Sequence, residues 1–259
     1  MANQKRSPKF ARQWRQSDLD DYNIKTQFQT ASTFFNTPVL PPPTADEELF
    51  TTEFDTDTLA KDNRIILTYL GYAMDPDESE SAVTELSWKL FYALGYGHPP
   101  HLIIMFKELQ ILSCGERKNA NTGISIIDRS SGKTEFVLVQ ECRRIGATRD
   151  PYPQSIATVI AAFQSNNSRR IAAGLDPLEN KTIPAIITIG SSPTFLKVPV
   201  TAELADCVGR GVYPITPTVV SVHEPEIPRP SQRIVEGMRP LDNRHIVFQC
   251  YEAFRQFVD

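Results

Sequence analysis

The stretch Phe136–Arg144, FVLVQECRR, decides our interpretation of the fold. It is an apolar strand that ends in charged residues. Because side chains alternate along a strand, Glu141 and Arg143 should share one face, while Cys142 should point to the opposite side. An acid and a base at the end of a core strand are costly unless they are paired or used. The pair is therefore either a strand-end salt bridge or part of a functional site.

The segments on either side of this strand predict a mixed sheet with helices on its faces, of the α/β or α+β class. Period-two and continuous apolar runs predict strands at 101–112, 123–127, 135–142, 184–190, 194–200 and 219–222. Helical periodicity and capping signals predict helices at 65–71, 78–94, 153–166, 202–209 and 241–257. The order of these segments is a helix, a three-strand meander, a helix, two strands and further short elements. A proline-containing loop is expected at 223–240.

The chain divides into an N-terminal extension, residues 1–60, and a main domain, residues 61–259. Residues 1–17 carry five bases and no acid, and 18–57 are acidic and contain three successive prolines at 41–43. Such charge blocks and proline runs are typical of a partly disordered, solvated segment. The alternative is an arm that binds nucleic acid or directs targeting.

The overall composition limits the classes of function. The 259 residues have 27 bases and 31 acids, a formal net charge of -4, which excludes a protein held to nucleic acid by bulk positive charge. A local basic groove remains compatible with it. We expect an intracellular protein, cytoplasmic or nuclear, because the sequence has no apolar span, no secretory signal and four widely spaced cysteines.

Residues 78–258 resemble the PD-(D/E)XK nuclease superfamily, closest to uncharacterised fungal members. In that superfamily an acid-bearing first helix precedes strands that end in Glu-x-Lys, and a helix with Gln near its start follows. Here the corresponding residues are Glu78, Glu80 and Glu85 on or before the first helix, Glu141 and Arg143 on the strand, and Gln154 on the following helix. The resemblance implies a restriction-endonuclease-like fold that uses Mg²⁺ or Mn²⁺ to hydrolyse phosphodiester bonds of DNA or RNA.

Two positions depart from that motif. Gly123 stands where the superfamily has a metal-binding Asp, and Arg143 replaces the Lys. Arginine holds phosphate well but stays protonated, so it cannot shuttle a proton. We therefore expect loss of the parent nuclease activity. Asn121 and Ser125 should share the strand face of Gly123.

If the cleft is active, the resemblance gives Glu141 the role of metal ligand or base, Arg143 that of phosphate clamp, and Gln154 that of orienting residue. Glu85 and Glu108 are candidate additional metal ligands. A possible basic groove comprises Lys118, Lys133, Arg143, Arg144, Arg149, Arg169 and Arg170.

Three function classes remain open at this point. The first is a metal-dependent nuclease, and the second is a non-catalytic protein on the same fold that binds nucleic acid or a protein partner. The third is an enzyme that uses the cleft on a small anionic substrate. Phosphate-binding loops of the P-loop and Rossmann types are absent from the sequence.

Overall fold

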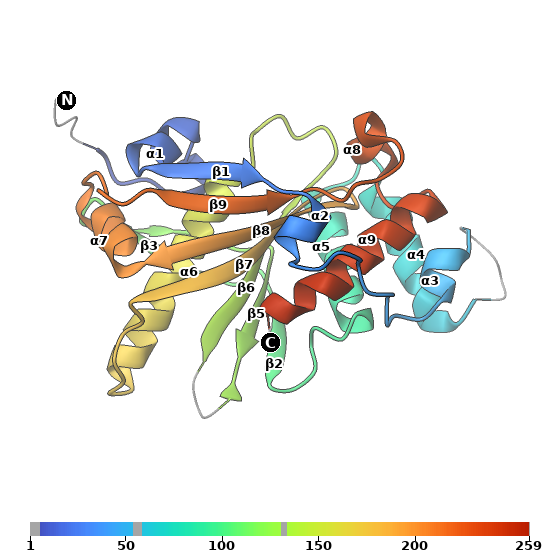
Figure 1. Cartoon of the computed structure of the whole chain (residues 1–259), viewed down its shortest axis with the longest axis horizontal. Coiled ribbons are helices and arrows are strands. Elements are labelled where there is room, and N and C mark those ends of the chain that lie inside the picture. The colour runs from blue at the N-terminus through green and yellow to red at the C-terminus, as the bar shows by residue number, and fades with distance from the viewer. Residues whose placement is uncertain (1–5, 54–58, 131–133, 259) are drawn as a thin grey trace.

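A mixed β-sheet forms the centre of the computed structural model, which describes residues 6–53, 59–130 and 134–258. In these residues seven strands hydrogen-bond in the order β1-β9-β8-β7-β6-β5-β2, and β3 and β4 form a separate hairpin (Figure 1). The strands are β1 Ile24–Phe28, β2 His101–Met105, β3 Gln110–Ser113, β4 Glu116–Asn119, β5 Ile124–Asp128, β6 Glu135–Arg143, β7 Asn180–Ile189, β8 Ser192–Thr201 and β9 Thr218–His223. The predicted mixed sheet flanked by helices is confirmed.

Helices cover both faces of the sheet. The α-helices are α1 Gln16–Asp21, α2 Ala31–Phe34, α3 Glu48–Thr51, α4 Lys61–Ala73, α5 Glu80–Ala93, α6 Tyr152–Ala172, α7 Ala202–Arg210, α8 Arg233–Glu236 and α9 Leu241–Phe254. Short 3₁₀ turns are η1 Ala11–Gln13, η3 Pro230–Gln232 and η4 Arg255–Phe257. Helix α6 lies behind the strands in Figure 1, whereas α9 crosses in front of them.

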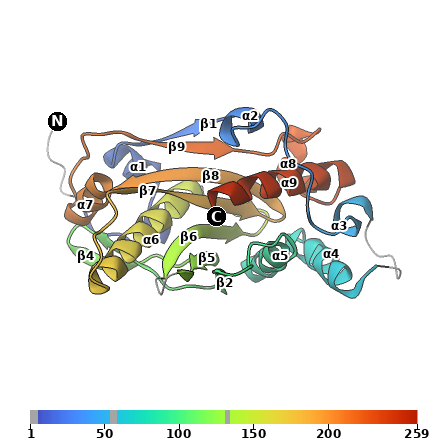
Figure 2. The same ribbon diagram turned by 60° about the horizontal axis from the view of Figure 1, so that its bottom comes forward.

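Two clusters of buried apolar side chains, taken over the described residues, correspond to these two layers. One joins α4, α5 and α9 to one face of the sheet, and the other joins α6, α7 and the N-terminal residues to the opposite face. In the turned view of Figure 2, α6 lies toward the left of the molecule and α5 with α4 toward the lower right. The central strand β6 is therefore buried on both faces.

The path from α5 to β7 matches the predicted order. Strands β2, β5 and β6 form an antiparallel meander, α6 makes the crossover, and β7 returns parallel to β6. Helix α5 ends at Ala93, and Gly95 follows its C-cap residue with a φ of +76°, which favours glycine. The amide of Tyr96 then bonds the carbonyl of Phe91 and that of Gly95 bonds Tyr92, which is the Schellman arrangement of a helix end.

The single strand predicted at 101–112 is instead two strands, because the chain leaves the sheet after Met105. Phe106 has a φ of +50°, and its amide bonds the carbonyl of Gly123. The chain then forms the β3–β4 hairpin, which the sequence did not predict, before it re-enters the sheet at β5. Both α6 and β7 are longer than predicted, and the expected loop at 223–240 contains α8 and η3.

The described part of the N-terminal extension lies against the main domain. Strand β1 adds to the sheet parallel to β9, and Trp14 and Leu19 are buried in the α6-side cluster. Phe34 and Phe35 are buried in the cluster on the other face. The apolar side chains among the charged ones account for this packing, since their burial outweighs the solvation of neighbouring charges.

Within the described residues, no helix is both long enough and apolar enough to span a lipid bilayer.

Side-chain amides near the end of α6 bond to the backbone of three other segments. Asn166 donates to the carbonyl of Phe136 at 3.0 Å and accepts from its amide at 2.7 Å. Asn167 makes the same pair of bonds with Leu178, at 3.0 and 2.7 Å. Gln164 does so with Leu112, at 3.2 and 2.8 Å. These amides satisfy backbone groups that have no strand partner, and so fix α6 relative to the sheet.

We expect Asn166→Ala to lower the free energy of unfolding by about 3 kcal/mol, since two buried backbone groups of Phe136 lose their partners. Asn166 is fully buried, whereas Asn167 is half-buried, so water can replace the amide in Asn167→Ala and the loss should be about 1 kcal/mol. Urea unfolding of both variants measures the difference. Equal losses would contradict the role given to burial.

Candidate functional site

The candidate site lies where β6 ends and α6 begins. Strand β6 brings Glu141 and Arg143 to this edge of the sheet, and the first turn of α6 adds Gln154. A register shift in the pairing of β5 with β6 decides which face these residues occupy. Ile126 pairs with Leu138 and Ile127 with Phe136, so Val137 is the extra residue of a β-bulge. From Val139 onward the odd-numbered side chains of β6 face the α6 layer.

A closed set of contacts joins four polar side chains at this edge. The Glu141 Oε1 atom lies 3.0 Å from Arg143 Nε and accepts a hydrogen bond from Gln154 Nε2 at 2.8 Å. Arg143 donates from its second terminal nitrogen to Gln154 Oε1 at 2.6 Å. It also lies 3.3 Å from Glu80 Oε1, on the first turn of α5. The angles at Arg143 Nε do not suit a hydrogen bond to Glu141. The contact between these two side chains is therefore an ion pair.

Glu141 is the most desolvated acid of this set, since only 8% of its surface is exposed. Burial raises the pKa of Glu141 to about 7, and the negative charge of Glu80 raises it in the same direction. Arg143, the Gln154 hydrogen bond and Arg149 act in the opposite direction. The carboxyl therefore changes its charge near neutral pH, while the guanidinium beside it stays positive.

Further arginines approach this set from the loop before α6 and from the N-terminal segment. The guanidinium of Arg149 donates to the carbonyl oxygen of Trp14 at 3.1 Å, which ties the loop to the residues after η1. Partial burial is the largest cause that lowers the pKa of Arg149 below its usual range. The positive charges of Arg15, Arg143 and Arg12 lower it further. The guanidinium group of Arg149 is thus repelled by three others, and we call Arg12, Arg15, Arg143 and Arg149 the arginine cluster.

The sequence did not place Arg12 and Arg15 in this site. Both belong to the basic N-terminal block, for which a nucleic-acid-binding arm was one of two interpretations. Trp14, between them, carried the only local signal for docking, because a large aromatic residue in a polar segment favours burial. It is 1% exposed and stacks on Tyr22 with a ring distance of 5.2 Å.

The two additional acids expected from the sequence lie elsewhere. Glu80, not Glu85, contacts Arg143. Glu85 lies five residues further along α5, about 140° around the helix and roughly 7 Å along its axis from Glu80. Glu108 is exposed in the loop after β2, where it lines a cavity of about 440 Å³ with Phe163 and other residues near the end of α6.

Gly123 does not occupy the position that the sequence predicted for it. A Cβ atom built there would lie 3.2 Å from Cys142 Sγ, on the α5 side of the sheet, whereas Glu141 faces the α6 side. Strand β5 begins one residue later, and Ser125 pairs with Val139. The prediction that Ser125 shares the face of Gly123 is therefore wrong, because regular alternation does not extend back to Gly123.

The arrangement does not suit a divalent cation. Among the described residues, no group of three or more His, Cys, Asp and Glu side chains is placed to hold a metal ion. The acids of this site are Glu141 and Glu80, and the positive group of Arg143 lies in contact with both. Mg²⁺ and Mn²⁺ prefer several oxygen ligands, so the guanidinium would have to leave before either ion could bind.

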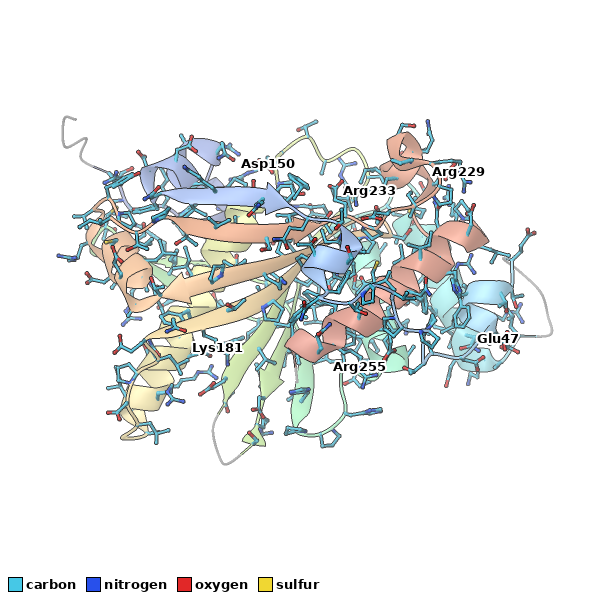
Figure 3. The ribbon with its side chains drawn as sticks, in the orientation of Figure 1. Glu47, Asp150, Lys181, Arg229, Arg233 and Arg255 are labelled. Atoms are coloured by element: carbon cyan, nitrogen blue, oxygen red, sulfur yellow. The ribbon has the colours of Figure 1, made fainter. Side chains whose placement is uncertain are left out.

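The basic groove expected from the sequence separates into two regions. Arg170 pairs with Glu135 at 2.8 Å, as does Lys181 at 3.1 Å, and Arg169 lies over the Phe136 ring. These contacts are at the far end of α6, a helix of 21 residues and about 30 Å. Figure 3 labels Asp150, next to Arg149, near the top of the view and Lys181 in its lower left part. Lys133 lies outside the described residues.

No family model matches the sequence of this chain, and no curated protein matches it.

The pKa of Glu141 predicts how stability depends on pH. Between pH 4.5, the ordinary pKa, and about 7, the folded protein keeps a proton on Glu141 that the unfolded chain has lost. This contribution to stability is complete below pH 4.5 and disappears as the pH rises through 7. We therefore expect the stability of the wild type relative to Glu141→Gln to fall by up to about 3 kcal/mol across this window.

Urea unfolding of both proteins at a series of pH values measures this difference. Glu85→Gln makes the same chemical change outside the contact set. Its free energy of unfolding relative to the wild type should not show the pH dependence expected for Glu141→Gln. If the wild type instead gained stability relative to Glu141→Gln as the pH rises, attraction to Arg143 would outweigh burial.

Proposed function

We propose that this protein binds the phosphate backbone of nucleic acid at the arginine cluster, on a restriction-endonuclease-like fold that does not perform metal-dependent cleavage. The observation that carries this proposal is an excess of positive charge at one place. Among the described residues, the positive charges of Arg12, Arg15 and Arg143 all act on Arg149, and the two acids in contact with Arg143 are Glu80 and Glu141. Near neutral pH, Glu141 is partly protonated, so it offsets less of this positive charge.

An excess of charge of this kind is unfavourable in the free protein and favourable when an anion binds. Guanidinium groups donate several hydrogen bonds in a fixed plane, which suits the oxygens of a phosphate. Contacts of Glu141, Glu80 and Gln154 hold Arg143 in one orientation, so little side-chain freedom remains to be lost on binding. The bond from Arg149 to the Trp14 carbonyl does the same for a second arginine.

The topology supports the family part of the proposal. The order α5, β2, β5, β6, α6, β7, with β7 parallel to β6, is the order of the resemblance, with the β3–β4 hairpin inserted. Gln154 contacts both Glu141 and Arg143, as an orienting residue would. Topology alone does not define activity, and the arginine cluster is the feature that supports binding.

Loss of cleavage is part of the same proposal. Glu141 is engaged by Arg143 and Gln154, and a side chain at Gly123 would point toward Cys142. An arginine in place of lysine cannot release a proton to activate water. The substitutions keep the attraction for phosphate and remove the groups that would hold a cation and move a proton.

We expect the double variant Arg15→Ala, Arg149→Ala to bind a short single-stranded DNA at least tenfold more weakly than the wild type at low salt. Each arginine that contacts a phosphate releases bound cations from the nucleic acid, so the slope of log affinity against log salt should fall by about one to two. Fluorescence anisotropy with a labelled oligonucleotide measures both quantities.

A matched control is Lys61→Ala, Arg255→Ala, which removes the same charge from α4 and η4. Figure 3 labels Arg255, just after α9, well below Asp150, which is the sequence neighbour of Arg149. Equal loss of affinity in both double variants would contradict a defined site. Cleavage of the oligonucleotide with Mg²⁺ or Mn²⁺ that disappears in Glu141→Ala would overturn the proposal in favour of an active nuclease.

A further inference from the structure

A small cavity of about 190 Å³ lies beside the arginine cluster. It is lined by Phe10, Ala11, Arg12, Asn119, Asn121 and Gln154. Arg12 belongs to the arginine cluster, and Gln154 bonds directly to Arg143 at 2.6 Å. A ligand that contacts the cluster can therefore extend into this cavity without leaving the surface of the protein.

Two amide side chains of the cavity wall are available to a ligand. Asn119 ends β4 and Asn121 lies two residues later, with Ala120 between them buried to 1% exposure. Because alternate residues of an extended segment point the same way, both amides face outward from the buried Ala120. Neither amide makes a hydrogen bond to another group in the described part of the chain, although each can donate and accept.

The cavity is also lined by one aromatic ring and one guanidinium. The Phe10 ring lies 5.5 Å from Arg12 Cζ and 5.7 Å from Lys118 Nζ. The backbone amide of Phe10 bonds Gln13 Oε1 at 3.0 Å, and its carbonyl accepts from the Gln13 amide at 2.8 Å. These bonds fix the backbone of Phe10 at the start of η1, so the ring has a defined place in the wall.

We propose that this cavity binds one unpaired nucleobase of the nucleic acid whose phosphates contact the arginine cluster. Unpaired bases stack on aromatic rings and on arginine planes, and their edges form hydrogen bonds with amide side chains. The cavity is smaller than the roughly 300–1,000 Å³ of a pocket for a larger organic ligand, and suits a single flat ring system. This inference rests on the proposed function, because the arginine cluster supplies the contacts to phosphate.

Single strands are then preferred over duplexes. In a duplex the edges of the bases are paired and their faces are stacked, so a base enters the cavity only after it leaves the helix, at an energetic cost. Stacking on one aromatic side chain contributes enough for about a tenfold difference in affinity. The preference should hold for DNA and RNA alike, because neither the ring nor the amides depend on the sugar.

The test compares three DNA probes of equal length on the full chain: a single strand, the same strand with abasic sites throughout, and the duplex. The wild type should bind the single strand about tenfold more tightly than either of the other probes. The matching RNA strand should bind within a few-fold of the DNA strand. Two variants test the wall of the cavity: Phe10→Leu, which keeps an apolar side chain, and Asn121→Ala, an exposed substitution. Each should lower the ratio of the affinity for the normal strand to the affinity for the abasic strand.

Affinity for the abasic strand should not change in these variants, because that probe contacts only the arginine cluster. Asn167→Ala, a change of the same kind near the other end of α6, is the matched control for Asn121→Ala and should leave the advantage intact. Equal binding of the normal and abasic strands by the wild type would overturn the base site and leave the proposed phosphate binding in place. Failure to bind any of the probes would overturn the proposed function itself.

Discussion

The burial of β6 on both faces is the constraint on which the rest of the structure depends. Helix α6 covers one face and α5 the other, so a charged residue near the end of β6 loses water and must find partners inside the protein. Glu141 finds them in Arg143 and Gln154. The same contacts fix the orientation of Arg143 and the position of α6 relative to β6. The core thus determines the geometry of the site at its edge.

The N-terminal segment completes this site although it is distant in sequence from β6. Strand β1 extends the sheet beside β9, and Trp14 is inserted in the α6-side core, which brings the residues around η1 to the start of α6. The bond from Arg149 to the Trp14 carbonyl joins the two segments directly. Apolar burial of Trp14 supplies the free energy that brings Arg12 and Arg15 close to other positive charges.

Much of the sheet could be predicted from the sequence, because continuous apolar runs such as those of β6 and β7 have few alternatives. The contact of Glu141 with Arg143 also follows from strand alternation. The β3–β4 hairpin was missed because its strands are short and polar on the outside, so they carry little periodic signal. Strand β1, with one buried residue among five, was missed for the same reason.

The site was predicted where neighbours in sequence are neighbours in space, and mispredicted where the backbone departs from regular geometry. Gly123 lies just outside β5, so counting alternate residues gave the wrong face for it. Helix α5 carries several acids, and their positions around and along the helix decide that Glu80 rather than Glu85 reaches Arg143. Trp14 indicates that the N-terminal segment packs on the core, but no local pattern in the sequence indicates that Arg12 lies near Arg149.

The proposed binding role accounts for the polar residues that this site contains. A lysine in place of Arg143 could give up its proton when buried, whereas the arginine keeps its charge and holds phosphate in a plane. With the guanidinium between Glu80 and Glu141, each acid orients a cation of the protein instead of an added metal ion. The carboxylates then act as positioning groups, and the free positive charge of the neighbouring arginines is what remains for a ligand to neutralise.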